Sequence, residues 1–305
     1  MIRPEQFSNY PLVREAFDYI QKNYFLYAKT KDFILAHFDE DWLRFGEEML
    51  KLFKTKYPFQ QRYWESFQSF IRYSHEFVVL QIELTKKGRY RHTASSEVVK
   101  TVYQTGVMEA YYLDGLFLSQ VFWPNHYRMC RYFQDQLKHC SPEGKLLEVP
   151  CGTGAYLYLA HQALPLVQIQ ARDVSPYSTQ YTKEMLNVGG YHPARIDTGD
   201  IFALEEQSPF DYIVCGELLE HLDEPRSLLD KLKSLLKKDG YLFLTTAIFA
   251  AAIDHVYLFH TVDEVRDMLT ANFEIISELI LPTSLEPYHS NMRDVPINYA
   301  CLLRT

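Results

Sequence analysis

From residue 145 to the end of the chain, short apolar runs alternate with segments of helical periodicity. Seven of these runs predict β-strands, at 145–149, 167–173, 194–198, 211–215, 241–246, 273–281 and 297–303. The segment 225–238 carries its leucines on one helical face, and we expect that helix to close at Gly240. Strands that alternate with helices predict an α/β fold with a parallel, doubly wound sheet.

The first 120 residues or so have a different character. Between Phe59 and Phe122 there is no proline, and aromatic and apolar residues recur at helical spacing. This pattern predicts an all-helical N-terminal domain over 1–123, followed by the α/β domain over 124–305. The aromatic residues just before the boundary are explained by core packing or by a cap that holds a substrate.

Composition narrows the classes of function. The chain has 305 residues, 47% of them hydrophobic, which is enough for one large core or two modest ones. Its net charge of -8 argues against general binding of nucleic acid or of an anionic membrane. The five cysteines form no C-x-x-C pair, and the most apolar run is too short to span a bilayer. We therefore expect a cytoplasmic protein with reduced thiols, no membrane partner and no nucleic-acid partner.

A strand, a glycine turn and a helix start follow one another between Leu146 and Ala160. In α/β folds this arrangement brings backbone N–H groups and a helix N-terminus close to a ligand. A dinucleotide fingerprint, G-x-G-x-x-G, would need glycine at Pro150 and Ala155, or at Leu157 in the other register. The dinucleotide interpretation therefore fails in both registers.

The run EVPCGTG, residues 148–154, resembles motif I of the class I, Rossmann-like methyltransferases that use S-adenosylmethionine and act on small molecules. Glu148 fills the acidic position of that motif, Gly152 and Gly154 fill two glycine positions, and Pro150 departs from the pattern. The resemblance implies a seven-stranded sheet with the last strand antiparallel. It also implies S-adenosyl-L-methionine as cofactor and S-adenosyl-L-homocysteine as product, with an altered loop at Pro150.

Further acidic residues arrive in the order that this family requires, and the resemblance covers roughly residues 127–305. It implies that Asp173, with Val174, binds the ribose hydroxyls, and that Asp200 and Ile201 bind adenine. Glu217 lies in the segment 216–221, which would line the methyl-transfer pocket. Each acid also has a plain alternative as a strand-end or helix-cap residue.

The acceptor is less constrained than the cofactor. The signature of base-amine methyltransferases is absent after the fourth predicted strand, where CGELLEH stands instead. We expect methyl transfer to oxygen, nitrogen or carbon of a small metabolite or natural-product intermediate. One alternative is a metal-assisted RNA 2'-O-methyltransferase, with ligands from Glu217, Glu220, His221 and His255; we expect no metal. Another is a catalytically silent cofactor-binding module of an assembly.

Candidate catalytic residues are His221, His255 and Glu217, because an oxygen or protonated amine acceptor needs a base. Four aromatic residues are candidates for contact with the acceptor: Tyr112, Trp123, Tyr127 and Tyr257. The basic loop at 85–93 leaves open an acceptor attached to a carrier protein. A homodimer is also left open.

Overall fold

The computed structural model describes residues 1–191, 195–205 and 209–305. Its sheet has seven strands in the order β3-β2-β1-β4-β5-β7-β6. The strands are β1 Lys145–Glu148, β2 Gln168–Asp173, β3 Arg195–Thr198, β4 Phe210–Gly216, β5 Leu236–Ile248, β6 Glu274–Pro282 and β7 Ile297–Arg304. All seven predicted strands are confirmed, although Ala194, at the start of the third prediction, lies outside the described residues.

The pairing of the strands is parallel from β3 to β5, and β7 runs antiparallel to both β5 and β6. The expected α/β, Rossmann-like methyltransferase sheet with an antiparallel last strand is therefore confirmed. Consecutive residues of each central strand face opposite sides of the sheet. In β1, Leu146 packs with the N-terminal helices, whereas Leu147 packs with the helices on the other face.

Both faces of the sheet are covered by helices. On one face lie α8 (Ala155–Ala163) and α9 (Pro176–Val188), and on the other lie α10 (Pro225–Leu235) and α11 (Val262–Thr270). The helix expected to close at Gly240 ends at Leu235 instead. Leu236 is already extended because it pairs with Phe210 at the start of β4, so the last predicted turn belongs to β5.

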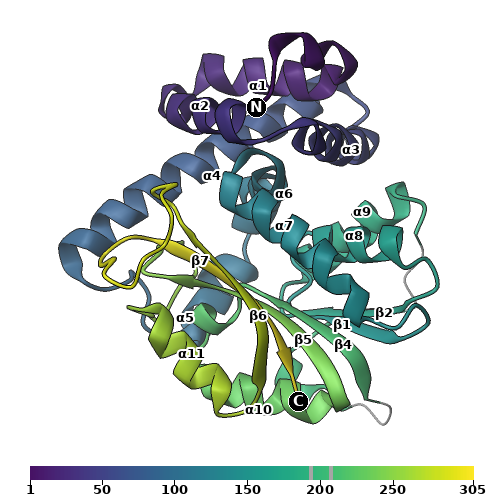
Figure 1. The fold of residues 1–305 in the computed structure, drawn as a ribbon, viewed down its shortest axis with the longest axis vertical. Helices are drawn as coiled ribbons and strands as arrows, with labels where there is room; N and C mark the ends of the chain where they lie inside the picture. Colours follow the sequence, from purple (N-terminus) through teal and green to yellow (C-terminus); the bar gives the residue numbers. More distant parts are fainter. Residues whose placement is uncertain (192–194, 206–208) are drawn as a thin grey trace.

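The described residues before Lys145 form helices and no strand, which confirms the helical N-terminal region. The main helices are α1 Pro11–Asn23, α2 Ala28–His37, α3 Glu40–Lys56, α4 Gln60–Lys87, α5 Ser95–Val98, α6 Leu113–Phe122 and α7 Pro124–Gln136. Two π-helical segments, Val99–Tyr103 and Met108–Tyr112, connect α5 to α6. Figure 1 shows α1, α2 and α3 at one end of the molecule and the sheet at the other, with α4, α6 and α7 between them.

The helical region is tied to the carboxyl ends of the strands by hydrogen bonds from α4 and the loop after it. The side-chain amide of Gln81 donates to the Phe249 carbonyl at 2.9 Å and accepts from the Ala251 amide at 2.9 Å. The Tyr90 hydroxyl donates to the Ala250 carbonyl at 2.8 Å. A single apolar cluster runs from the N-terminal helices to one face of the sheet. Among the described helices, none combines the length and apolar character needed to cross a bilayer.

Candidate functional site

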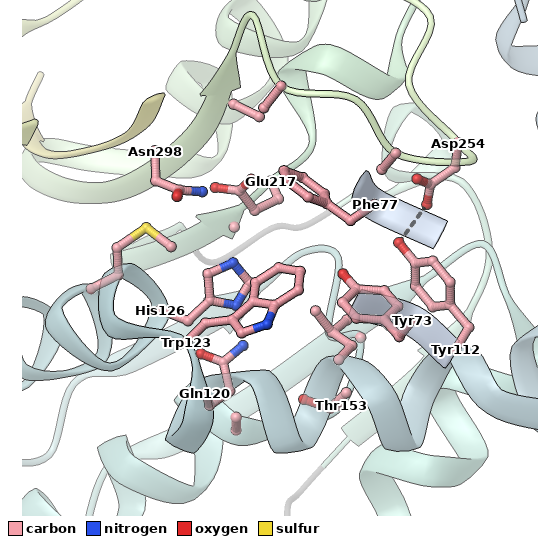
Figure 2. Close-up of a pocket in the computed structure, with 18 of the residues that line it drawn as sticks. Tyr73, Phe77, Tyr112, Gln120, Trp123, His126, Thr153, Glu217, Asp254 and Asn298 are labelled. Atoms are coloured by element: carbon pink, nitrogen blue, oxygen red, sulfur yellow. Dashed lines mark hydrogen bonds between the residues drawn. The ribbon is translucent and has the colours of Figure 1, made fainter. Parts of the chain in front are cut away.

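A cavity of about 480 Å³ lies where the helical region covers the carboxyl ends of the strands. Its lining includes residues of α4, both π-helical segments, α6 and α7 on the helical side. On the sheet side it includes residues at or after the ends of β1, β2, β4 and β5, and the start of β7. Figure 2 shows these side chains converging from both sides. Parallel sheets bind ligands at this edge, so the cavity is the candidate site.

The two glycines of the loop after β1 have different roles. Gly152 lines the cavity with φ of +48°, and a Cβ built there meets no atom within 4 Å. Gly154 does not line the cavity, and a Cβ there, at φ of +72°, would lie 2.9 Å from the Thr182 Cγ2 atom on α9. Gly152 therefore keeps space open for a ligand, whereas Gly154 permits close packing. Pro150 also lines the cavity.

Two carboxylates stand beside this loop. Glu148 is buried at the end of β1, burial raises its pKa well above the ordinary value, and its Oε2 atom has no partner. Asp173, at the end of β2, accepts from the amides of Gly152 at 3.0 Å and Ser175 at 2.8 Å. Burial raises the pKa of Asp173 to about 6, although both amides lower it. Val174 lines the cavity next to Asp173.

These loop residues fit the polar groups of an adenosyl cofactor. The unpartnered Oε2 atom of buried Glu148 needs a hydrogen-bond donor, and the cofactor's hydroxyl and ammonium groups are donors. The Asp173 carboxylate, fixed by two backbone amides, keeps lone pairs for further donors. The open space over Gly152 lets a ligand approach the backbone closely.

Asp200 and Ile201 do not reach the cavity. The Asp200 side chain is exposed and accepts from the Phe202 amide at 3.0 Å, which caps the short 3₁₀ helix Ile201–Ala203. Ile201 is buried in the apolar cluster on the far face of the sheet. The cap and the core explain these two residues in this structure, whereas the resemblance assigned them to adenine.

Glu217 and Glu220 are two buried acids that follow β4. Glu217 has a left-handed backbone, with φ of 48°, and its amide donates to the Thr245 carbonyl at 3.0 Å and hydroxyl at 3.0 Å. Its Oε1 atom is buried without a partner, and Glu217 lines the cavity. Glu220 accepts from the Thr246 hydroxyl at 2.6 Å. Burial raises the pKa of both acids, and the charge of Glu217 raises that of Glu220 further.

A buried hydrogen-bond network surrounds His221 and Asp254. The Tyr103 hydroxyl lies 2.7 Å from His221 Nδ1 and 3.1 Å from Asp254 Oδ2, and the Tyr112 hydroxyl donates to the same Asp254 oxygen at 2.8 Å. His221 Nδ1 is itself 3.5 Å from Asp254. Burial favours a raised pKa at Asp254, but His221, His255 and the two tyrosines hold that pKa below its ordinary value. Asp254 is therefore a charged carboxylate in the wall of the cavity.

His255 is also buried in the cavity wall, with its ring 4.9 Å from the His221 ring between centroids. Its Nδ1 atom is 2.8 Å from the Ala250 carbonyl, so it carries the proton and leaves Nε2 as an acceptor. Burial and the charge of His221 lower the pKa of His255 to about 4. Ligand atoms of Glu220, His221 and His255 lie within 4.8 Å of one another, which is compatible with holding a metal ion.

Of the four aromatic residues expected at the acceptor, Tyr112 and Trp123 line the cavity. Tyr127 does not, because it packs on Phe38 and Phe45, with ring centroids 4.9 and 5.2 Å away. Tyr257 packs on Phe259 and the cluster around α11. Neither tyrosine faces the cavity.

Several cavity residues escaped the sequence analysis. They are Tyr73, Phe77, Tyr103, Gln120, Asn125, His126 and Asn298. The available signal was the pair of polar residues Asn125 and His126, which follows the apolar run 121–124. Asn298 gave no signal, because it lies inside a predicted strand.

Comparisons with known proteins identify a methyltransferase domain in the chain. Residues 118–268 match the family model described as a methyltransferase domain. A ubiquinone biosynthesis O-methyltransferase from Xanthomonas euvesicatoria pv. vesicatoria (strain 85-10) is 32% identical over 115 residues, which are 36% of this chain and 47% of that protein. A malonyl-[acyl-carrier protein] O-methyltransferase from Paenibacillus sp. (strain JDR-2) is 33% identical over 107 residues, 34% of this chain and 39% of that protein.

The chain therefore spans less than half the length of these curated relatives. Among solved structures, coclaurine N-methyltransferase bound to N-methylheliamine and S-adenosylhomocysteine has a TM-score of 0.54 at 14% identity. That match covers 85% of this chain and 99% of the other. At this identity the likeness concerns the fold alone, and it agrees with the sheet described above.

Proposed function

We propose that this chain, which carries a class I S-adenosylmethionine-dependent methyltransferase domain, transfers a methyl group to a small molecule bound in the cavity. One observation carries the proposal. Glu148, Asp173, Glu217 and His221, from three different strand ends, all line the same cavity as the aromatic residues of the helical region. The cofactor site and the acceptor site are then two parts of the same cavity.

The residues after β1 and β2 are proposed to hold the cofactor. S-adenosylmethionine, when bound, supplies an electrophilic methyl group on its sulfonium sulfur. Glu148 and Asp173 offer oxygen acceptors to its polar groups, and Gly152 leaves room for it. Walls that exclude water strengthen these electrostatic interactions, and the aromatic faces favour a cationic sulfur.

His221 is proposed as the base that takes a proton from an oxygen or nitrogen acceptor. The Asp254 carboxylate, 3.5 Å from His221 Nδ1, stabilises the imidazolium that forms when His221 accepts a proton. Tyr103 and Tyr112 hold Asp254 in that position. His255, which burial keeps neutral at pH 7, is proposed to orient the acceptor through its free Nε2 atom.

The proposal is tested by methyl transfer from methyl-labelled S-adenosylmethionine to a metabolite extract, with mass spectrometry of the labelled product. We expect His221→Ala to lower turnover roughly 100- to 10,000-fold and to remove the acidic limb of the pH–rate profile. His255→Ala should mainly weaken acceptor binding. As a control, His139→Ala changes a histidine outside the cavity and should leave turnover unchanged. If both cavity variants keep wild-type rates and pH profiles, neither histidine has the role in catalysis that we propose.

A metal-assisted reaction is the second candidate, favoured by the buried group Glu220, His221 and His255. In it, His255 would be oriented by its Nδ1 contact with the Ala250 carbonyl, as metal-bound histidines commonly are. Our account predicts that dialysis against a chelator leaves methyl transfer unchanged. Activity that is lost with chelator and restored by magnesium, manganese or cobalt would favour the metal-assisted reaction instead.

A further inference from the structure

Four buried polar side chains line the part of the cavity formed by α6, α7 and β7. They are Gln120, Asn125, His126 and Asn298, and we call them the polar end. In Figure 2, Asn298, His126 and Gln120 lie on the opposite side of the view from Tyr112 and Asp254. Buried polar atoms normally have hydrogen-bond partners, so any free ones here point to a ligand.

Asn125 and Asn298 each keep one amide atom free. The Asn125 Nδ2 atom donates to the Leu281 carbonyl at 2.9 Å and to Asn298 Oδ1 at 3.2 Å. This pairing fixes both amide orientations. It leaves Asn125 Oδ1 as a buried acceptor without a partner and Asn298 Nδ2 as a donor into the cavity.

His126 and Gln120 are oriented in the same manner. The Ser119 hydroxyl donates to the Leu116 carbonyl at 2.7 Å, so it accepts the Nδ1 proton of His126, 2.8 Å away. His126 Nε2 is then an acceptor, and burial lowers the pKa of the ring to about 4, which keeps it neutral. The Cys130 thiol donates to Gln120 Oε1 at 3.0 Å, which leaves the Gln120 Nε2 group as a donor. The polar end thus offers two acceptors and two donors without any charge.

The position of Asn298 in the sheet separates it from the cofactor side. Asp173 is on β2 and Asn298 is on β7, with β1, β4 and β5 between them. Four strand-to-strand steps of about 4.8 Å put these two positions roughly 19 Å apart across the sheet. The polar end therefore faces the half of the cavity left to the acceptor.

The charges around the cavity restrict the acceptor further. Glu148, Asp173, Glu217 and Asp254 line it, and within the described residues no lysine or arginine does. An anionic group on the acceptor would be buried near the charged carboxylate of Asp254 without a lysine or arginine to pair with, which is costly. The indole of Trp123 stacks on Tyr73 with centroids 5.3 Å apart, and rings of this kind bind flat apolar groups.

We infer that the polar end recognises the methyl acceptor, and that this acceptor is an aromatic molecule with a hydroxyl group and no anionic group. The inference rests on the proposed function. A hydroxyl group can donate to Asn125 Oδ1 or His126 Nε2 and accept from Asn298 Nδ2. The aromatic ring of the acceptor then lies against Trp123 and Tyr73.

Three related probes test this inference by ligand-observed NMR and calorimetry on the full chain saturated with S-adenosylhomocysteine. Tyramine carries a phenolic hydroxyl and an ammonium, phenethylamine lacks the hydroxyl, and 3-(4-hydroxyphenyl)propanoate replaces the ammonium with a carboxylate. We expect tyramine to bind at least 10-fold more tightly than either of the others. Phenethylamine leaves the atoms of the polar end unpaired, and the other probe buries its carboxylate in the acidic cavity. Equal binding of the carboxylate probe, or no binding of tyramine, would overturn the inference.

Variants of the polar end add a second test. Asn298→Ala and His126→Phe should each weaken tyramine binding about 5- to 10-fold and leave phenethylamine binding unchanged, since only the hydroxyl contact is lost. Asn272→Ala, which changes a partly buried asparagine outside the cavity, is the matched control. Melting temperatures and S-adenosylhomocysteine affinity report on folding. If a variant loses affinity for tyramine and phenethylamine equally, the polar end does not recognise the hydroxyl group. If the wild type does not bind S-adenosylhomocysteine, the proposed function itself is contradicted.

Discussion

Asp173 illustrates how a single residue couples the glycine loop to the next strand. Its carboxylate accepts the amides of Gly152 and Ser175, so one side chain fixes the turn after β1 and the turn after β2 together. Both turns line the cavity through Gly152 and Val174. The acid therefore shapes the site as well as offering oxygen atoms to a ligand.

The raised pKa of Asp173, about 6, predicts a pH dependence of cofactor binding. Above this pKa the carboxylate is ionised and accepts hydrogen bonds well, whereas below it the proton weakens that role. S-adenosylhomocysteine affinity in the wild type should therefore fall as pH is lowered from 7 to 5, measured by calorimetry. Asp173→Asn should bind weakly with little pH dependence over that range. If the affinity of this variant depends on pH as strongly as that of the wild type, the titrating group is another residue.

At this scale the sequence predicted residues whose role follows from their place at a strand end. Glu148 and Asp173 end β1 and β2, Glu217 and His221 lie in the segment after β4, and all four line the cavity. Asp200 also follows a strand, yet it caps a short helix, because an acid serves equally well in either role. For Tyr127 the helical pattern did not distinguish the side facing the cavity from the side facing α2 and α3.

Helix α6 packs against α4 at a point where only glycine fits. A Cβ built on Gly115 would lie 2.5 Å from the Tyr73 Cβ atom and 3.2 Å from the Ser69 carbonyl oxygen. The close approach brings Trp123, at the end of α6, against Tyr73 in the cavity wall. The packing of these two helices therefore sets the shape of the aromatic wall.

We expect Gly115→Ala to lower the free energy of unfolding by about 1–3 kcal/mol, because α4 and α6 must move apart to admit the methyl group. Gly106→Ala is the matched control, since a Cβ there meets no atom within 4 Å and its φ is not positive. That variant should stay within about 0.5 kcal/mol of the wild type. Urea unfolding measures both values, and equal stabilities of the two variants would contradict the close packing.

Element types were predictable where periodicity was long or alternating, as in the seven strands. The end of α10 was not, because Leu236 fits a helical face and a buried strand equally well in sequence. Only its pairing with Phe210 selects the strand. Long-range pairing of this kind overrides the local pattern.

Across the whole molecule, the helical region and the sheet together line the candidate cavity and both contribute to a shared apolar cluster. The boundary between residues 123 and 124 stays a prediction. Residues before this boundary form the aromatic wall of the cavity, and residues after it supply the carboxylates. The sequence revealed the sheet and the motif residues, whereas the polar end depends on how α7 meets β7. Asn125 and Asn298 are 173 positions apart and are brought together only by the fold.

Titration with S-adenosylhomocysteine by calorimetry is the most direct test of the account. We expect one site per chain with roughly micromolar affinity, about -8 kcal/mol, in the wild type. Asp173→Asn should bind about 5- to 150-fold more weakly, because a buried acceptor is replaced. Asp239→Asn, an exposed acid outside the cavity, should bind like the wild type. A folded wild-type protein that shows no binding would contradict the account.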